Sequence, residues 1–155
     1  MIDLRVELAP VEEKSLLYSL LNSCLSELSL YGDVDATYPY FDAYWDVDER
    51  RWPYLIRQGS EIVGFAFVNT WSPSGKGTDF AIAEFYVTPN ARQSGIGREA
   101  ANSIFQRHAG IWELSIMPLN QPAKRFWPSA IEASQAKMVE HMEVDGETIY
   151  RFTIG

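Results

Sequence analysis

The sequence is poor in the side chains that build metal centres and disulfide frameworks. Its 155 residues include one cysteine and two histidines. Cys24 has no partner for a disulfide, and it lies in an apolar helical pattern that favours a buried, unreactive thiol. His108 and His141 are far apart in the chain and have no cysteine or carboxylate at ligand spacing. We therefore expect no metal site and no disulfide, and a reducing cytoplasm fits this composition.

Long hydrophobic runs and an excess of basic residues are also missing. No apolar stretch approaches the roughly 20 residues of a membrane helix, and no signal-peptide pattern opens the sequence. The 13 Lys and Arg residues are outnumbered by 21 Asp and Glu residues, which gives a net charge of -8. Nucleic-acid phosphates require clustered basic side chains. The sequence thus predicts no membrane and no nucleic-acid partner, and it weakly favours cationic partners.

The apolar content is sufficient for one globular domain, which we place at 1–155. Hydrophobic residues make up 46% of the chain and aromatic residues 14%, without repeats or linkers. Pro128 lies inside the last predicted helix, at 121–133, and should kink or split it. The hydrophobic periods predict strands at 2–8, 52–57, 61–70, 80–87, 112–117, 138–144 and 148–154, helices at 11–31, from 96 to before 110 and at 121–133, and a loop with a short helix at 33–48.

The most informative segment is a turn that joins a predicted strand to an amphipathic helix within residues 83–105. It contains Gly95 and Gly97, which permit close backbone approach and positive φ angles, and it is flanked by Arg92 and Arg98. Backbone N–H groups at such a turn, with the free donors of a helix N-terminus, form a positive concavity. The turn therefore predicts an anion site, most naturally for a phosphate or pyrophosphate.

Two nucleotide motifs compete for this turn. A P-loop needs four residues between its glycines and then Lys followed by Ser or Thr, which this segment does not offer. The spacing Gly95-x-Gly97-x-x-Ala100 fits the looser dinucleotide fingerprint, but Ser115 stands about where that motif needs an acidic residue. Too little chain remains to complete a doubly wound sheet, so a dinucleotide-binding oxidoreductase is disfavoured.

The stretch Arg92–Gly97 resembles the Q/R-x-x-G-x-G/A motif of the GNAT acetyltransferases, and it follows a strand ending in Val87-Thr88-Pro89, as in that family. Downstream, Asn120, Ala123 and the pair Phe126-Trp127 are similar to the family's N-x-x-A-x-x-F/L-Y segment. The resemblance implies an α/β (α+β) fold, with a mixed, mostly antiparallel, splayed sheet of about six or seven strands and about four flanking helices.

By this resemblance the chain would use acetyl-coenzyme A (acetyl-CoA) as co-substrate. The strand that ends at Val87 would pair with the pantetheine arm, and the amides of the turn would hold the pyrophosphate. The cofactor-binding residues that the resemblance implies are Phe85, Tyr86, Val87, Arg92, Gln93, Ser94, Gly95, Ile96, Gly97, Arg98, Asn120, Ala123 and Phe126.

Acetyl transfer to an amine needs a base, because the amine is an ammonium ion at neutral pH. The resemblance implies Glu84 as that base, with a pKa raised by partial burial, and a structural glutamate is the alternative reading. A strand N–H near Tyr86 or Val87 would polarise the acetyl carbonyl. Trp127 stands where many relatives have tyrosine, so the proton for the leaving thiolate would come from water, Tyr86 or another tyrosine.

The segment from Asp33 to Asp48 is acidic and aromatic, and the resemblance places it beside the acceptor together with residues near Gly146. Carboxylates and aromatic faces suit a cationic amine, such as a polyamine, an aminoglycoside-like amine or a protein amine. The pocket residues expected there are Tyr38, Tyr40, Tyr44 and Trp45.

We therefore expect an N-acetyltransferase that acts on a primary amine, most simply a cationic small molecule. The amine would attack directly in a ternary complex, because no positioned cysteine supports an acyl-enzyme. The alternative is a non-catalytic GNAT-fold module that binds an acyl-CoA. Homodimers are common in the resembled family, so a homodimer is also compatible with the sequence.

Overall fold

A single seven-stranded sheet with three α-helices organises the computed structural model, which describes residues 3–155. The predicted start of the first strand at Ile2 lies outside the described residues. Among residues 3–155, no helix has both the length and the apolar character that a membrane span requires. The elements are β1 (Leu4–Leu8), η1 (Val11–Glu13), α1 (Lys14–Leu28), η2 (Asp42–Trp45), β2 (Trp52–Gln58), β3 (Glu61–Asn69), β4 (Phe80–Val87), η3 (Pro89–Ala91), α2 (Ile96–Gln106), β5 (Gly110–Ile116), α3 (Gln121–Ala133), β6 (Lys137–Val144) and β7 (Glu147–Ile154), where η marks a short 3-10 helix.

The predicted α/β class and element order are confirmed, with two differences in the helices. The short helix expected within 33–48 is only the 3-10 turn η2, because this segment has no apolar helical period and contains turn-forming Asp and Pro residues. Residues 3–155 therefore contain three α-helices rather than about four. The expected split at Pro128 was wrong, since α3 continues through it as one element.

The sheet has the strand order β1-β2-β3-β4-β5-β7-β6, and only the central pair β4 and β5 is parallel. This pair is joined by α2, as a parallel connection requires a crossover. The last two strands form a hairpin whose turn residues Asp145 and Gly146 have φ angles of 52° and 86°. Two positive φ angles define the type I′ turn that the Asp-Gly pair predicts.

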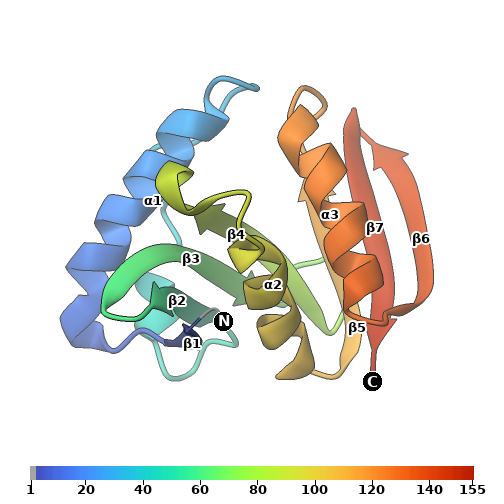
Figure 1. Ribbon diagram of the computed structural model, residues 1–155. Coiled ribbons are helices and arrows are strands. Elements are labelled where there is room, and N and C mark those ends of the chain that lie inside the picture. Colours follow the sequence, from blue (N-terminus) through green and yellow to red (C-terminus); the bar gives the residue numbers. More distant parts are fainter. Residues whose placement is uncertain (1–2) are drawn as a thin grey trace.

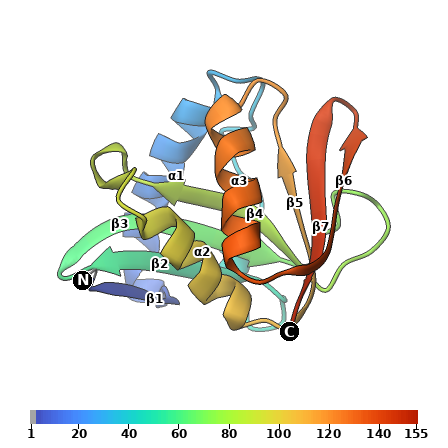
Figure 2. The same cartoon turned by 45° about the vertical axis from the view of Figure 1, so that its right-hand side comes forward.

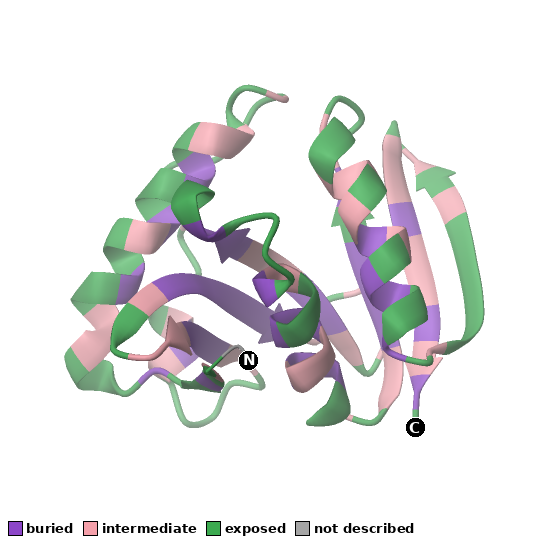
Figure 3. Ribbon diagram, viewed as in Figure 1, coloured by how far each residue is buried: buried purple, intermediate pink, exposed green. Residues whose placement is uncertain are grey.

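Helices cover both faces of the sheet: α1 lies on one face, and α2 and α3 lie on the other (Figures 1 and 2). Side chains of β3 alternate between the two cores, with Phe65 and Phe67 on the α1 side and Ala66 and Val68 on the other. The helix faces turned toward the sheet are buried, and the outer faces are exposed (Figure 3).

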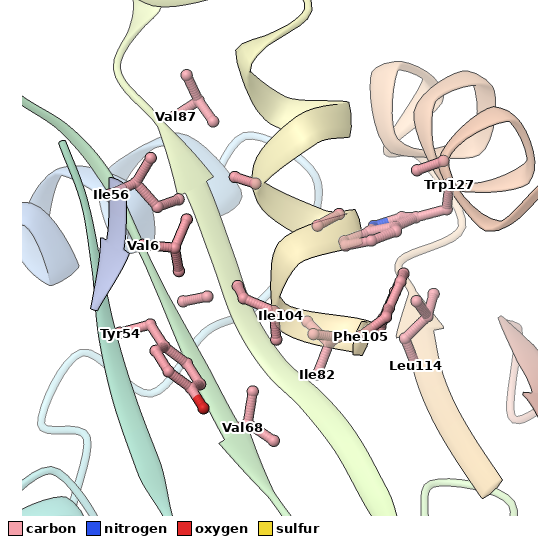
Figure 4. Close-up of a cluster of buried hydrophobic side chains, with 14 of the residues drawn as sticks. Val6, Tyr54, Ile56, Val68, Ile82, Val87, Ile104, Phe105, Leu114 and Trp127 are labelled. Carbon is pink, nitrogen blue, oxygen red and sulfur yellow. The ribbon is translucent and has the colours of Figure 1, made fainter. Parts of the chain in front are cut away.

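The larger core lies beneath α2 and α3. Figure 4 shows Trp127 extending from α3 toward α2, where Phe105 and Ile104 point into the same core as Leu114 of β5. Phe105 contacts the ring of Trp112 edge-on at a centroid distance of 4.9 Å. Aromatic packing of this kind fixes the two helices against the sheet and thereby fixes their N-terminal ends.

The parallel pair of strands is short, because β4 and β5 separate. Only Phe80–Ile82 pair with Trp112–Leu114, although β4 continues to Val87 and β5 continues to Ile116. Beyond Ile82 the edge of β4 that faces β5 has no strand partner within the described chain. The backbone groups on that edge are free to bind an extended ligand in the manner of an added strand.

A β-bulge lies at the point where the strands separate. The pairing of β3 with β4 shifts by one residue at Ala83, which has no partner in β3. Ala83 and Tyr86 both pack in the α1-side core, although strict alternation would place them on opposite faces. Phe85 packs in the core of the other face, so Glu84 is turned toward the α1 side. The extra residue, Ala83, thus changes the face of the sheet toward which the side chain of Glu84 points.

We predict that Gly64→Ala destabilises the protein by about 2 to 4 kcal/mol, because a Cβ at this position would overlap the carbonyl oxygen of Tyr86 in β4. Urea unfolding followed by tryptophan fluorescence would measure the change. Glu61→Ala, at the exposed start of the same strand, is the control and should shift stability by less than about 0.5 kcal/mol. Equal stability of wild type and Gly64→Ala would show that β4 does not approach β3 this closely.

Candidate active site

Two hollows meet where β4 leaves β5. We call them the basic cleft, which runs along β4, the 92–98 turn and α3, and the acidic cavity, which lies between the 34–40 loop, the 69–73 loop and β5. Their volumes are about 610 and 500 Å³. Five residues line both and form the junction between them: Leu28, Phe85, Asn120, Ala123 and Trp127.

The 92–98 turn has the geometry of an anion site. Gln93 and Gly95 have φ angles of 63° and 85°, so left-handed residues alternate just before α2 begins at Ile96. Such a turn aims successive N–H groups into one concavity, and the free donors of the helix N-terminus add to it. Arg98 and Arg125 also line the cleft, and neither forms an ion pair with another described residue. The cleft can therefore hold phosphate groups.

Arg92 lines the basic cleft and also makes structural contacts within the protein. Its Nε donates to the carbonyl of Val87 at 2.7 Å, and its Nη2 contacts Glu27 of α1 at 2.7 Å. Its guanidinium also lies over the ring of Tyr86, 5.4 Å from the centroid. These contacts tie α1 to the end of β4. Because Glu27 already offsets its charge, Arg92 offers less to an anion than Arg98 or Arg125 does.

Most of the residues predicted to bind a cofactor lie together. Two do not reach the cleft: Ser94 turns its hydroxyl to the carbonyl of Ala91 at 2.8 Å, and Ile96 is buried in the core. Arg125 was missed because a basic residue on a predicted helix carries no sequence signal for a phosphate site. The predicted residues that do line the basic cleft are Phe85, Tyr86, Val87, Arg92, Gln93, Gly95, Gly97, Arg98, Asn120, Ala123 and Phe126.

The two glycines of the turn have different roles. Gly95 takes the positive φ expected of it and caps α2. Gly97, in contrast, lies inside α2 with helical backbone and is needed for close approach rather than for a positive φ. A Cβ at Gly97 would lie 3.0 Å from the ring of Phe126. Its missing side chain allows α2 and α3 to approach one another beside the junction.

Glu84 lies in the wall of the acidic cavity, where the bulge turns it toward Tyr38. The Tyr38 hydroxyl donates a hydrogen bond of 3.0 Å to Oε2 of Glu84, and no described residue bonds to Oε1. Burial raises the pKa of Glu84 to about 7, and the hydrogen bond from Tyr38 moderates this rise. A carboxyl with this pKa exchanges a proton readily at neutral pH, as a general base must.

Tyr38 is held in an unusual backbone conformation. Its φ angle is 43°, in the left-handed region that residues other than glycine rarely adopt. Its ring packs against Phe67 at a centroid distance of 5.8 Å, and burial raises the pKa of its hydroxyl, so this group stays protonated and donates. Backbone strain of this kind is often kept at functional sites.

The rest of the acidic cavity is formed by residues from three separate loops and strand ends. Asp35 and Tyr40 come from the segment after α1, Trp71 from the segment after β3, and Glu147 from the start of β7. Glu147 accepts a hydrogen bond from Ser115 of β5. The sequence pointed to the first segment and to the neighbourhood of Gly146, but it gave no signal for Trp71.

A buried carboxylate fixes the loop that carries Trp71. Glu113 of β5 is completely buried and accepts hydrogen bonds from the hydroxyls of Ser72 and Ser74, at 2.8 and 2.7 Å, and an ion pair from Arg151. Burial alone would raise the pKa of Glu113, but the hydrogen bonds from Ser74, Ser72 and Arg151 hold it below its usual range. The loop is therefore anchored to the sheet by a permanent charge.

Three predicted site residues lie outside the acidic cavity. Tyr44 is buried and stacks on Phe67 at 4.0 Å, and Trp45 donates from Nε1 to the carbonyl of Ala9 at 3.0 Å. Both support the wall from behind and do not line it. Tyr86 lines the basic cleft under Arg92. Of the four predicted pocket residues, Tyr38 and Tyr40 line the cavity.

Trp127 and Phe85 narrow the junction between the two hollows. Phe85 stacks on Phe126 at 5.6 Å and meets Trp127 edge-on at 5.1 Å. Cys24 lines the basic cleft close by, and burial raises the pKa of its thiol, so it stays protonated. Among the side chains of residues 3–155, no three His, Cys, Asp or Glu residues gather closely enough to hold a metal ion.

This arrangement suits the transfer of a group from a phosphate-bearing carrier to a nucleophile. The carrier's anionic part has donors in the basic cleft, and its extended arm has the free edge of β4. A nucleophile in the acidic cavity would find a proton acceptor in the carboxyl of Glu84. The two ligands would meet at the junction, which Phe85 and Trp127 line from both sides.

Comparisons with known proteins find the same fold. The chain superposes on an acetyltransferase from Thermus thermophilus (TM-score 0.69, 20% identity, 98% of this chain and 97% of that chain). It is also similar to a putative acetyltransferase from Salmonella typhimurium solved with its cofactor acetyl-CoA (TM-score 0.63, 12% identity, 98% and 93%). A third similar structure is a ribosomal-protein-alanine N-acetyltransferase from Brucella melitensis (TM-score 0.64, 16% identity, 97% and 99%).

At these identities the superpositions establish the fold. A comparison with curated proteins finds no match. The sequence model described as the acetyltransferase (GNAT) family matches residues 15–129, which include β4, the 92–98 turn and most of α3. This match extends over most of the chain, and it shows that the protein belongs to the GNAT family of acetyltransferases.

Proposed function

We propose that this protein is an N-acetyltransferase that transfers the acetyl group of acetyl-CoA to a cationic primary amine. The observation that carries the proposal is the position of Glu84 in an acidic cavity that opens, through the junction, onto a basic cleft. GNAT proteins use acetyl-CoA as co-substrate. The separate charges of the two hollows suit an anionic acetyl donor on one side and a cationic acceptor on the other.

The basic cleft fits acetyl-CoA by its donors and by its shape. The N–H groups of the 92–98 turn would hold the pyrophosphate, and Arg98 and Arg125 would add charge. The free edge of β4 from Phe85 to Val87 would pair with the pantetheine arm, since no strand competes for it there. A backbone N–H of Tyr86 or Val87 would then stabilise negative charge on the acetyl oxygen.

Acetyl-CoA supplies an acetyl thioester, and the chain's own residues handle the proton. Oε1 of Glu84 would take a proton from the acceptor ammonium, directly or through a water, which leaves a neutral nitrogen. That nitrogen forms a bond to the acetyl carbon, and the bond from carbon to sulfur breaks. The acetylated nitrogen would then lose its second proton, which would pass through water to the leaving thiolate, because the indole of Trp127 at the junction is not an acid.

Transfer is proposed to be direct rather than through an acyl-cysteine. Cys24 is the one cysteine of the chain. It is buried and held as a thiol, because burial raises the pKa of its side chain. A thiol that stays protonated is a poor nucleophile. Both ligands would therefore be bound before the amine attacks.

Replacing the base should abolish turnover and leave donor binding intact. We expect Glu84→Gln to lower the rate of acetyl transfer by about 100-fold or more, because it removes the proton acceptor. The dissociation constant of acetyl-CoA, measured by calorimetry, should change by less than about twofold, since Glu84 lines the acidic cavity and not the basic cleft. A variant with full activity would show that Glu84 is a structural residue.

The hydrogen bond from Tyr38 should set the pKa of Glu84. Tyr38→Phe removes a donor that stabilises the carboxylate, so the pKa of Glu84 should rise above its wild-type value of about 7. Carbon-13 NMR titration of the side-chain carboxyls would measure this, with Glu84→Gln to assign the signal. The acid limb of the pH profile of kcat should move in the same direction. An unchanged titration would mean that the two side chains do not interact in solution.

The charged donors of the basic cleft can be tested without an acceptor. Arg98→Ala and Arg125→Ala should each weaken acetyl-CoA binding by about tenfold, because each removes a charge-assisted contact to a phosphate. Lys124→Ala is the matched control, since Lys124 neighbours Arg125 on α3 but does not line the cleft. Equal losses in all three variants would indicate a general effect of charge rather than a phosphate site.

A further inference from the structure

We infer that the acceptor is a small dicationic amine, of which one amino group is acetylated while a second, cationic group is held by Asp35, Glu147 and the ring of Trp71. The inference rests on the proposed function, because it concerns the acceptor of the same reaction. It goes further by assigning a site for the part of the acceptor that does not react.

The acidic cavity contains negative charge without a counterion. Its wall has three carboxylates, those of Asp35, Glu84 and Glu147, and no Lys, Arg or His among the described residues. None of the three forms an ion pair within residues 3–155. Glu27 and Glu113 are paired with arginine, whereas other described acidic side chains, such as Glu61 and Glu99, form no ion pair. The cavity is distinguished by three such unpaired carboxylates in one wall. A cationic ligand would therefore supply the positive charge that balances these carboxylates.

One cation is not enough to balance these charges during the reaction. The amine that attacks must be neutral, and its proton goes to Glu84, so this pair carries no net charge when the bond forms. Asp35 and Glu147 are two further carboxylates of the same wall. Hydrogen bonds from Thr37 lower the pKa of Asp35, and its carboxylate is solvent-exposed. These two carboxylates therefore favour an acceptor with a positive charge at a second position.

An exposed aromatic ring lies in the same wall. The side chain of Trp71 is 71% exposed although it lines the cavity, and its loop is fixed by the buried Glu113. Tyr40, 62% exposed, also lines the cavity, but Arg51 already lies over its ring at 5.2 Å. Trp71 is thus the more available face for a cation, and indole is the strongest such partner among the aromatic side chains.

The size of the cavity suits a small acceptor. A volume of about 500 Å³ accommodates a short diamine completely, with water around it. A peptide N-terminus would bring one ammonium group and a polypeptide backbone, which leaves Asp35 and Glu147 without a second cation unless a basic residue follows. The charges of the wall therefore favour a free diamine or polyamine over a protein amine.

The test compares acceptors of equal length with the wild-type protein and acetyl-CoA. The probes are 1,4-diaminobutane, 1-aminobutane and 4-aminobutan-1-ol, which differ only in the group at the far end. We expect kcat/KM for the diamine to exceed that for either monoamine by about tenfold or more, beyond the factor of two for its two reactive ends. A peptide with a free N-terminus should be a poorer acceptor than the diamine.

Two variants locate the second site. Glu147→Gln and Asp35→Asn should each lower kcat/KM for the diamine by about fivefold to tenfold and change kcat/KM for 1-aminobutane by less than twofold. Glu143→Gln is the matched control, because Glu143 is an acidic residue of the same β6–β7 hairpin that does not line the cavity. It should leave both acceptors unaffected.

The outcomes separate this inference from the proposed function. Equal kcat/KM values for the diamine and the monoamines, or a peptide as the better acceptor, would overturn the inference while acetyl transfer itself stands. Binding of acetyl-CoA without transfer to any amine, peptide included, would overturn the proposed function instead. A preference for the diamine that survives in both Glu147→Gln and Asp35→Asn would overturn the assigned residues.

Discussion

The separation of β4 from β5 after Ile82 is the constraint on which the rest of the molecule depends. A continuous parallel pair would satisfy the backbone groups of both strands and close the sheet. Here the pair stops while both strands continue, so a free edge remains at the centre of the fold, with α1 and α3 on its two sides. Both hollows open at this edge. The bulge at Ala83 belongs to the same feature, because it turns Glu84 to one side of β4 while Phe85 faces the other.

The two hollows differ in charge because different parts of the chain build them. The basic cleft takes its arginines and free N–H groups from the turn before α2 and from α3. The acidic cavity takes its carboxylates from the loop after α1, from β4 and from the final hairpin. Strong fields of opposite sign in adjoining hollows would sort two ligands of opposite charge and reduce the chance that either occupies the wrong place. The net charge of -8 does not reveal that one hollow is basic and the other acidic.

The sequence predicted the fold class, the order of elements along the chain and the 92–98 turn between β4 and α2, because these depend on local signals. Alternating side chains identify β4, and the spacing of Gly95 and Gly97 identifies the turn. It did not predict the bulge, since one unpaired residue leaves no mark on a hydrophobic pattern. A local pattern also cannot show which way a side chain faces. Tyr44 and Trp45 were expected in the pocket because aromatic rings suit a cation site, but in the folded protein they pack behind the wall of the acidic cavity. Trp71 was missed because its loop reaches the acidic cavity only through the tertiary fold, which the local sequence does not reveal.

The contact between Tyr38 and Glu84 joins the stability of the fold to its chemistry. Burial raises the pKa of Glu84 from 4.5 to about 7, so the folded state holds this proton more tightly than the unfolded chain does. The stabilisation is complete below the unfolded value and is lost as the pH rises toward 7, a difference of at most about 3 kcal/mol. The protein thus keeps the buried carboxyl of Glu84 at a cost in stability at neutral pH. Tyr38 offsets part of that cost by donating to the carboxylate, and it does so from a strained backbone in the loop that also carries Asp35 and Tyr40. In the proposed reaction, a movement of this loop would change the wall of the acidic cavity and the pKa of Glu84 together, so acceptor binding and proton transfer would be coupled through one hydrogen bond.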